Sequence, residues 1–141
     1  MWKARCMSYS GSVTPRQAYD ALRDNSNAVL IDVRTSAEWT YVGLPDLNTL
    51  GKYVVCVEWV NFPDGQVNVN FVDQVRAAGV GDGPIYLLCR SGVRSVPAAE
   101  ALITAGIGTV YNVLDGFEGG LDKHGHRSSE GWKMADLPWR Q

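Results

Sequence analysis

One short segment gathers the residues best suited to chemistry, a cysteine and two arginines in Cys89-Arg90-Ser91-Gly92-Val93-Arg94-Ser95. The apolar run at 84–89 predicts a buried strand that ends at the cysteine, and the pattern after the segment predicts a helix that begins at Ser95. In open α/β sheets, ligands bind at the carboxyl ends of the strands. The sequence therefore predicts a thiol at the edge of a sheet where ligands bind.

Three features of this segment favour a thiolate over a thiol. The backbone N–H groups of a tight loop can converge on an anion, and the N-terminus of the following helix carries a partial positive charge. Arg90 and Arg94 add two permanent cations. Cysteines in such surroundings ionise readily, so we expect Cys89 to be a nucleophile at neutral pH. Gly92 suits a position with positive φ or a close backbone approach.

The elements that must position this segment alternate along the chain. Thr14-Pro15-Arg16-Gln17 predicts a capped helix that runs to about Arg23. Apolar runs predict further strands, and helical spacing predicts further helices. The predicted strands are 28–33, 53–57, 84–89 and 109–113, and the later helices are 36–39, 71–78 and 95–105. This alternation predicts one α/β domain over residues 8–141, preceded by a mobile segment at 1–7.

Composition excludes several classes of protein. The chain has 141 residues, 45% of them hydrophobic and 20% charged, which indicates one globular domain and argues against disorder. A net charge of −2 supplies no basic field, so we expect no nucleic-acid partner. No apolar run approaches the roughly 18 residues that cross a bilayer, so we expect no membrane partner. The N-terminus does not resemble a signal peptide, and we expect a cytoplasmic protein.

The other metal-binding or thiol residues give weak signals. Cys6 and Cys56 form neither a CxxC motif nor a disulfide framework with Cys89. Cys56 lies in an apolar run and is predicted to be an inert core thiol, while Cys6 is a candidate sulfur acceptor that nothing places near Cys89. His124 and His126 have only Asp122 and Glu130 nearby, so we expect no metal.

Three motifs together resemble those of a known family. The cysteine segment resembles the active-site loop of single-domain rhodaneses, which are thiosulfate sulfurtransferases. Leu30-Ile31-Asp32-Val33-Arg34-Thr35-Ser36-Ala37-Glu38-Trp39 resembles the N-terminal signature of the family. Residues 110–120, with Trp132 beyond them, resemble its closing strand and glycine-rich loop. The resemblance implies a rhodanese-like three-layer fold, with a central, mostly parallel sheet and helices on both faces.

The resemblance also implies an activity. Cys89 would take the outer sulfur of thiosulfate or a similar small anionic donor, hold it as a persulfide without a cofactor, and pass it to cyanide, a thiol or a protein acceptor. Two covalent steps of this kind give ping-pong kinetics. The donor would be bound by the rest of the loop, namely Arg90, Ser91, Gly92, Val93, Arg94 and Ser95.

The chain departs from the family pattern in two places. Val42-Gly43-Leu44-Pro45-Asp46-Leu47 stands where many members have Gly-His-Ile-Pro-Gly-Ala, and the segment after it is longer. We therefore expect residues 40–61 to differ in shape. We expect the long tail after Gly120 to fold over the mouth of the site.

Several other side chains have two readings each. Asp32 and Arg34 either form a structural ion pair or touch substrate. Glu38 is either a proton acceptor or a solvated helix residue. Four aromatic side chains either line a pocket beside Cys89 or pack in the core, namely Trp39, Trp59, Phe117 and Trp132.

Two other functions remain open from the sequence. Cysteine phosphatases and arsenate reductases also use a cysteine at a strand end, but with five residues between the cysteine and the arginine. Here four residues separate Cys89 from Arg94, which predicts a nest too small for a tetrahedral phosphate. A non-catalytic binding or regulatory module of the same fold would typically lack the cysteine.

Overall fold

The computed structural model describes residues 11–61, 64–80, 83–90, 94–119 and 131–141. At its centre is a five-stranded sheet in the order β1-β6-β5-β2-β4, and neighbouring strands in it are parallel. The strands of this sheet are β1 (Gly11–Val13), β2 (Val29–Asp32), β4 (Val55–Cys56), β5 (Ile85–Leu88) and β6 (Val110–Val113). The prediction of an α/β fold is confirmed, although β1 was not predicted.

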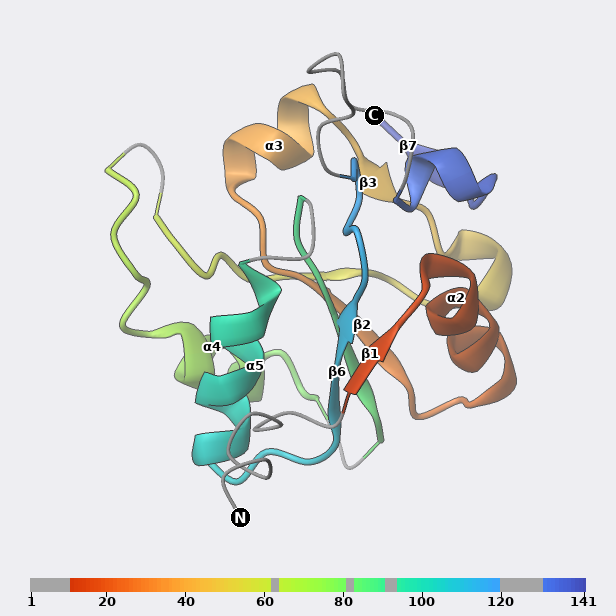
Figure 1. The fold of residues 1–141 in the computed structure, drawn as a ribbon. Helices are drawn as coiled ribbons and strands as arrows, with labels where there is room; N and C mark the ends of the chain where they lie inside the picture. Colours follow the sequence, from red (N-terminus) through yellow and green to blue (C-terminus); the bar gives the residue numbers. More distant parts are fainter. Residues whose placement is uncertain (1–10, 62–63, 81–82, 91–93, 120–130) are drawn as a thin grey trace.

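Helices cover both faces of the sheet. Helices α4 (Phe71–Ala77) and α5 (Ser95–Thr104) lie on one side, and α2 (Pro15–Asp24) lies on the other (Figure 1). Helix α3 (Ser36–Tyr41) follows β2 and lies beyond the carboxyl ends of the strands (Figure 1). Because every crossover returns the chain to the same end of the sheet, the loops after β2 and β5 meet there.

Alternation along the strands divides the core into two clusters, because successive side chains in a strand point to opposite faces. Ile31, Leu87 and Cys89 belong to the cluster that Leu102 of α5 joins. Leu30 and Leu88 point the other way and pack in the cluster that contains Trp132. Both faces of β5 are therefore buried, as expected for a central parallel strand.

Side chains close the N-termini of the first two helices. Thr14 and Gln17 form the predicted capping box of α2, with Gln17 N–H donating to Thr14 Oγ1 at 3.1 Å. Thr35 and Glu38 form a second capping box at α3, which the sequence analysis did not predict. Each box satisfies backbone N–H groups that a helix start otherwise leaves unpaired.

A second, two-stranded sheet joins the 40–61 segment to the C-terminal tail. Strand β3 (Leu44–Pro45) pairs antiparallel with β7 (Trp139–Arg140), and neither strand was predicted. Two 3-10 helices, η1 (Asn48–Leu50) and η2 (Lys133–Ala135), flank these strands in the chain. The part of the tail at 131–141 packs through Trp132 against Tyr19 of α2, with ring centroids 6.0 Å apart.

The part of the chain that the structure describes contains no helix long and apolar enough to cross a membrane. The predicted mobile segment at 1–7 and the part of the tail at 120–130 lie outside the described residues.

Candidate active site

Cys89 follows the last residue of β5, which lies between β6 and β2 in the middle of the sheet. Its side chain is completely buried, and its Sγ lies 3.4 Å from Oγ of Ser95, the first residue of α5. The N-terminus of α5 therefore lies at the cysteine. The helix start at Ser95 is as predicted, and the strand ends at Leu88, one residue before the predicted end.

The N-terminus of α5 differs from those of α2 and α3. Arg94 occupies the N-cap position in a helical conformation, and its side chain makes no capping hydrogen bond. A ten-residue helix without a side-chain cap offers N–H donors and a partial positive charge to an anion. Ser91, Gly92 and Val93 lie outside the described residues, so the predicted nest of loop N–H groups stays a prediction.

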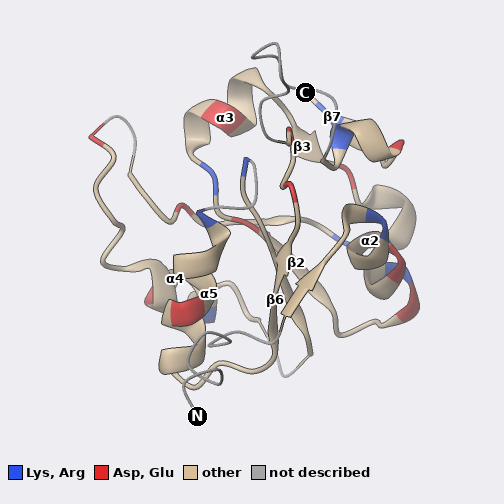
Figure 2. Ribbon diagram, viewed as in Figure 1, with Lys and Arg blue, Asp and Glu red and all other residues tan. Residues whose placement is uncertain are grey.

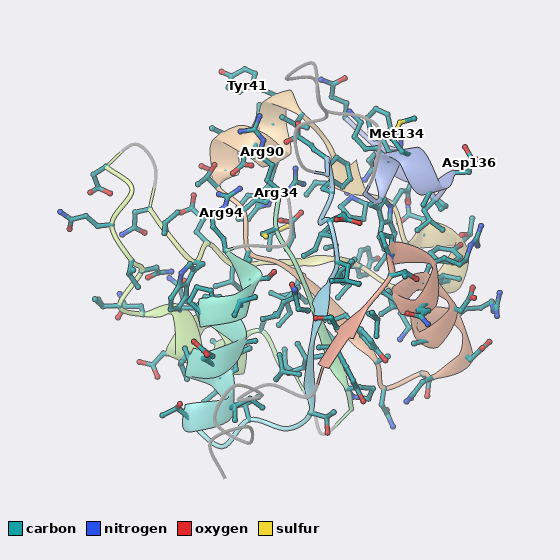
Figure 3. All side chains as sticks on the ribbon, in the orientation of Figure 1. Arg34, Tyr41, Arg90, Arg94, Met134 and Asp136 are labelled. Carbon is teal, nitrogen blue, oxygen red and sulfur yellow. The ribbon has the colours of Figure 1, made fainter. Side chains whose placement is uncertain are left out.

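Both loop arginines are already held by carboxylates. Arg94 donates from Nη1 and Nη2 to the two carboxylate oxygens of Glu38, at 2.8 Å each. Arg90 lies with Nε 3.1 Å from Oε2 of Glu118. Figure 2 shows both signs of charge at this end of the sheet, and Figure 3 shows the labelled Arg34, Arg90 and Arg94 side chains there. Each of the two cations expected beside Cys89 therefore has a carboxylate as its counter-charge.

The reading of Glu38 as a solvated helix residue is wrong, because its side chain is only 18% exposed. Desolvation raises the pKa of Glu38, but the hydrogen bonds and charge of Arg94, together with Thr35, outweigh it and lower the pKa overall. The hydrogen bond to Glu38 raises the pKa of Arg94 in turn, against desolvation, and the negative charges of Glu38 and Asp32 contribute in the same direction.

Asp32 and Arg34 form a completely buried ion pair, as their structural reading predicts. Arg34 donates from Nη2 to Asp32 Oδ2 at 2.7 Å and from Nε to Asp32 Oδ1 at 2.9 Å. The same Nη2 donates to the carbonyl oxygen of Gly43 at 2.6 Å, and the guanidinium lies 4.3 Å from the ring centroid of Phe117. These contacts fix the path of the chain from β2 through α3.

The glycine-rich loop after β6 supports the base of the cysteine loop. Phe117 N–H donates to the carbonyl oxygen of Cys89 at 2.8 Å, and Glu118 N–H donates to that of Arg90 at 2.9 Å. Gly116 has φ +58°, and a Cβ there would clash with the Cys89 carbonyl oxygen. Only glycine allows this approach, so Gly116 fixes the backbone on which the cysteine stands.

The hypothesis of an aromatic pocket at Cys89 is wrong for Phe117 and Trp132. Both are completely buried in the core cluster on the face of the sheet away from the Cys89 side chain. Trp59 packs edge-to-face on Phe71, with centroids 5.2 Å apart. Trp39 lines a cavity of about 440 Å³ together with Cys56.

Cys56 is exposed, so the prediction of a core thiol is wrong. It ends β4, an edge strand of the sheet with no described strand beyond it, and lies in register with Asp32. Desolvation by neighbouring atoms and the charge of Asp32 raise the pKa of the Cys56 thiol to about 12, against the opposing effect of Arg34 and Arg140. Cys56 therefore stays a protonated thiol at neutral pH.

The sequence analysis missed Asn112, a buried residue of β6. Asn112 Oδ1 accepts a hydrogen bond from Ser95 Oγ, which links β6 to the N-terminus of α5. The available signal was an amide side chain within the apolar run at 109–113, because a buried amide requires polar partners. Its partner could not be read from that run.

The remaining candidates lie outside the described residues, namely Cys6, Asp122, His124, His126 and Glu130. In the described ranges, no group of three potential metal ligands occurs.

Comparison with known proteins places this site in a family. Residues 10–141 match the model of the STR4 middle domain. The chain is 39% identical over 132 residues to the uncharacterized protein RC0915 of Rickettsia conorii, covering 92% of this chain and 96% of that one. It is 27% identical over 131 residues to the chloroplastic rhodanese-like domain-containing protein 4 of Arabidopsis thaliana, covering 92% of this chain and 25% of the relative.

Solved structures agree. Rv0390 from M. tuberculosis is 53% identical and superposes with a TM-score of 0.88, covering 94% of this chain and 98% of that one. The polysulfide-sulfur transferase homodimer of Wolinella succinogenes shares the fold, with a TM-score of 0.62 at 21% identity, over 98% of this chain and 82% of that one. The chain therefore belongs to the rhodanese-like family, through the STR4 middle-domain model that matches nearly its whole length.

Proposed function

We propose that this protein is a sulfurtransferase. It takes a sulfane sulfur from thiosulfate or a similar small anionic donor onto Cys89, and it passes that sulfur as a persulfide to cyanide, a thiol or a protein acceptor. At the level of the family, rhodanese-like relatives support sulfur transfer.

The observation that carries the proposal is the position of the Cys89 sulfur. It is buried at the end of the central strand, 3.4 Å from the first residue of a ten-residue helix that has no side-chain cap. A negative charge at this position gains from the partial positive charge of the helix N-terminus. The buried surroundings strengthen that interaction and keep bulk water from the persulfide.

The reaction balances without a cofactor. In the first step the Cys89 thiolate attacks the outer sulfur of thiosulfate, a sulfur–sulfur bond forms, and sulfite leaves with the electron pair of the bond that breaks. In the second step the acceptor attacks the outer sulfur of the persulfide, and the electron pair of the broken bond returns to Cys89. Cyanide leaves as thiocyanate, and the enzyme returns to its starting state.

Arg94 supplies the charge that draws the donor. Its guanidinium is held bidentately by Glu38, so its orientation is fixed before the donor arrives. Fixed donors stabilise developing charge without reorganisation, and the planar guanidinium suits an oxyanion better than an ammonium does. Glu38 lies on the helix after β2, so both strand ends contribute to the site.

The experiment is intact-protein mass spectrometry before and after incubation with thiosulfate, with Cys89→Ser and Cys56→Ser measured alongside. We expect wild type and Cys56→Ser to gain one sulfur atom, which a reductant or cyanide removes. We expect Cys89→Ser to gain none. If the wild type gains no sulfur from thiosulfate or from polysulfide, the protein is not a sulfurtransferase of this kind.

The same samples separate the two other functions. A cysteine phosphatase would release phosphate from an aryl phosphate in a reaction that Cys89→Ser abolishes. A non-catalytic module would show neither reaction while keeping its fold.

A further inference from the structure

Three buried polar side chains from three different elements form one chain of contacts behind the cysteine. Cys89 follows β5, Ser95 begins α5, and Asn112 lies in β6. Cys89 and Ser95 are completely buried, and Asn112 is 4% exposed. Ser95 Oγ lies 3.4 Å from Cys89 Sγ and donates a hydrogen bond to Asn112 Oδ1.

Counting hydrogens gives this chain a direction. A serine hydroxyl has one hydrogen and two lone pairs, and here Asn112 Oδ1 receives the hydrogen. Ser95 Oγ can then only accept from Cys89, so the order of donation is Cys89 S–H to Ser95 Oγ and Ser95 O–H to Asn112 Oδ1. This arrangement suits the protonated thiol.

A thiolate at Cys89 requires the opposite arrangement. A buried anion needs hydrogen-bond donors, and hydrogen bonds to charged groups are stronger than those between neutral groups. Rotation about a single bond turns the Ser95 hydroxyl hydrogen from Asn112 Oδ1 to Cys89 Sγ. The same hydrogen therefore has two acceptors, the amide oxygen and the sulfur, which compete for it.

We propose that Ser95 is a catalytic hydrogen-bond donor to the Cys89 thiolate, and that Asn112 is a positioning residue that holds the Ser95 hydrogen whenever Sγ is uncharged. This assignment rests on the sulfur transfer proposed above and adds two roles to it. It makes the Cys89 thiolate a partner of Ser95, in addition to the sulfur donor, and it gives Asn112 a part in the reaction.

The exchange of acceptors follows the reaction. In the persulfide, Sγ is bonded to the outer sulfur and carries no charge, so the Ser95 hydrogen stays on Asn112. When the acceptor attacks the outer sulfur, the bond between the two sulfurs breaks and its electron pair moves to Sγ. The Ser95 hydrogen then turns to the departing thiolate, which lowers the barrier to sulfur release.

Three ion pairs lie at the same end of the sheet as the cysteine. They are Arg94 of α5 with Glu38 of α3, the Asp32–Arg34 pair after β2, and the Arg90–Glu118 pair between the cysteine loop and the loop after β6. Variants at Ser95 and Asn112 leave all of them in place. A difference in the Cys89 alkylation midpoint between such variants therefore comes from the Ser95 hydroxyl and not from the surrounding charges.

The test uses the pH dependence of alkylation at Cys89. Wild type, Ser95→Ala, Asn112→Leu and the double variant react with iodoacetamide across a pH series, and the peptide that contains Cys89 is quantified by mass spectrometry. Ser95→Ala removes the donor, so we expect the midpoint to rise by about one pH unit, the scale of one hydrogen bond to a charged group. Asn112→Leu removes the competing acceptor, so we expect the midpoint to fall.

The double variant decides whether Asn112 acts through Ser95. Without the hydroxyl, the Asn112 substitution has no hydrogen to release, so we expect the double variant to match Ser95→Ala. If the two single variants shift the midpoint in the same direction, or if their effects add in the double variant, the proposal is wrong. Asn112→Asp provides a second test. Its carboxylate holds the Ser95 hydroxyl hydrogen and repels the Cys89 thiolate, so the alkylation midpoint of this variant should rise.

Circular dichroism and thermal unfolding identify any variant that does not fold. If Asn112→Leu fails to fold, Asn112→Asp with Ser95→Ala/Asn112→Asp takes its place. We expect the rise caused by the Asn112→Asp substitution to be larger in the presence of Ser95 than in its absence, and equal rises would overturn the proposal.

A single-turnover measurement distinguishes a failure of this proposal from a failure of the proposed sulfur transfer. We expect cyanide to discharge the persulfide of Ser95→Ala about tenfold more slowly than that of wild type, from the same hydrogen-bond energy. Alkylation requires no sulfur transfer. If wild type forms no persulfide while the alkylation midpoints shift as stated, sulfur transfer fails and the hydrogen-bond exchange stands. If persulfide forms but the midpoints do not shift, only the exchange fails.

Discussion

Strands β2 and β5 are neighbours in the central sheet, and each runs at its carboxyl end into a helix. After β2, side chains cap the next helix and pair the buried charge. Thr35 and Glu38 cap α3, Glu58 accepts the Ser36 N–H at 2.8 Å, and Arg34 is neutralised beside the strand. After β5 the N-cap residue Arg94 makes no side-chain cap. Two connections of the same kind thus leave their helix N-termini in opposite states.

The difference shows how one sheet edge serves both stability and chemistry. The β2–α3 connection has a capped helix and a buried arginine with its counter-charge, so we expect a change there to alter mainly the free energy of unfolding. The β5–α5 connection holds a cysteine beside a helix whose N-cap residue makes no side-chain cap, so we expect a substitution there to alter mainly the activity. The Arg94–Glu38 ion pair joins the two connections.

The largest expected effect comes from opening the closed connection. Asp32→Ala leaves the guanidinium of Arg34 buried without its counter-charge, and we expect a loss of about 3–5 kcal/mol in the free energy of unfolding. Urea denaturation measures the loss. Asp32→Ala/Arg34→Met is the matched control, because it removes both charges and should recover much of the stability. A loss below about 1 kcal/mol in the single variant would contradict the comparison.

The next effect comes from displacing the open connection. Gly116→Ala places a Cβ against the Cys89 carbonyl oxygen at a positive φ, so we expect lower stability and strongly reduced sulfur transfer. Gly106→Ala is its control, because Gly106 also has positive φ (+80°) but a Cβ there would meet nothing within 4 Å. We expect the control to lose about 1 kcal/mol from backbone strain and to keep its activity. Equal effects on activity would show that Gly116 does not fix the cysteine.

Separating the two connections should have a smaller effect. Glu38→Gln removes the charge that holds Arg94, and we expect the KM for thiosulfate to rise several-fold and the stability to fall by about 1 kcal/mol. The discharge of a preformed persulfide by cyanide should change little. Thr35→Ala, which also disturbs the α3 cap but leaves the ion pair, should lose similar stability without the change in KM.

The same ion pair has a pH dependence of defined sign. The folded pKa of Glu38 lies below its ordinary value of 4.5, so its contribution to stability is present above that value. The contribution is lost as the pH falls through the folded pKa. The difference in the free energy of unfolding between wild type and Glu38→Gln should therefore become smaller in acid. Unfolding measurements on both proteins across an acidic pH series test this. A constant deficit down to pH values below the folded pKa would contradict it.

The smallest effect is expected at Cys56, the cysteine at the end of the edge strand β4. Cys56→Ser changes an exposed side chain, so we expect the free energy of unfolding to stay within about 0.5 kcal/mol and sulfur transfer to be unchanged. Because the pKa of Cys56 is raised to about 12, iodoacetamide should modify buried Cys89 before exposed Cys56 at neutral pH. Peptide mass spectrometry gives the order, and the reverse order would contradict the contrast between the two thiols.

The outcome of the sequence predictions follows the range of the interactions involved. The capping box of Thr14 and Gln17 was predicted because its two members lie three residues apart. Cys56 was misjudged because an apolar run does not tell a central strand from an edge strand. For Trp132 and Phe117 the sequence left a pocket and the core open, because the face of a loop residue depends on where the loop packs, and the structure confirms the core.

By itself the sequence determined the strand that leads to Cys89, the helix that begins at Ser95 and the small number of residues between them. Those features arise from propensities and patterns within a few consecutive residues. Only the tertiary structure decided which side chains face that loop: Glu38 pairs with Arg94 across 56 positions, and Asn112 binds Ser95 across 17. In a parallel sheet, neighbouring strands are joined by long crossovers, so their order, and with it the partners at the sheet edge, is set by global packing.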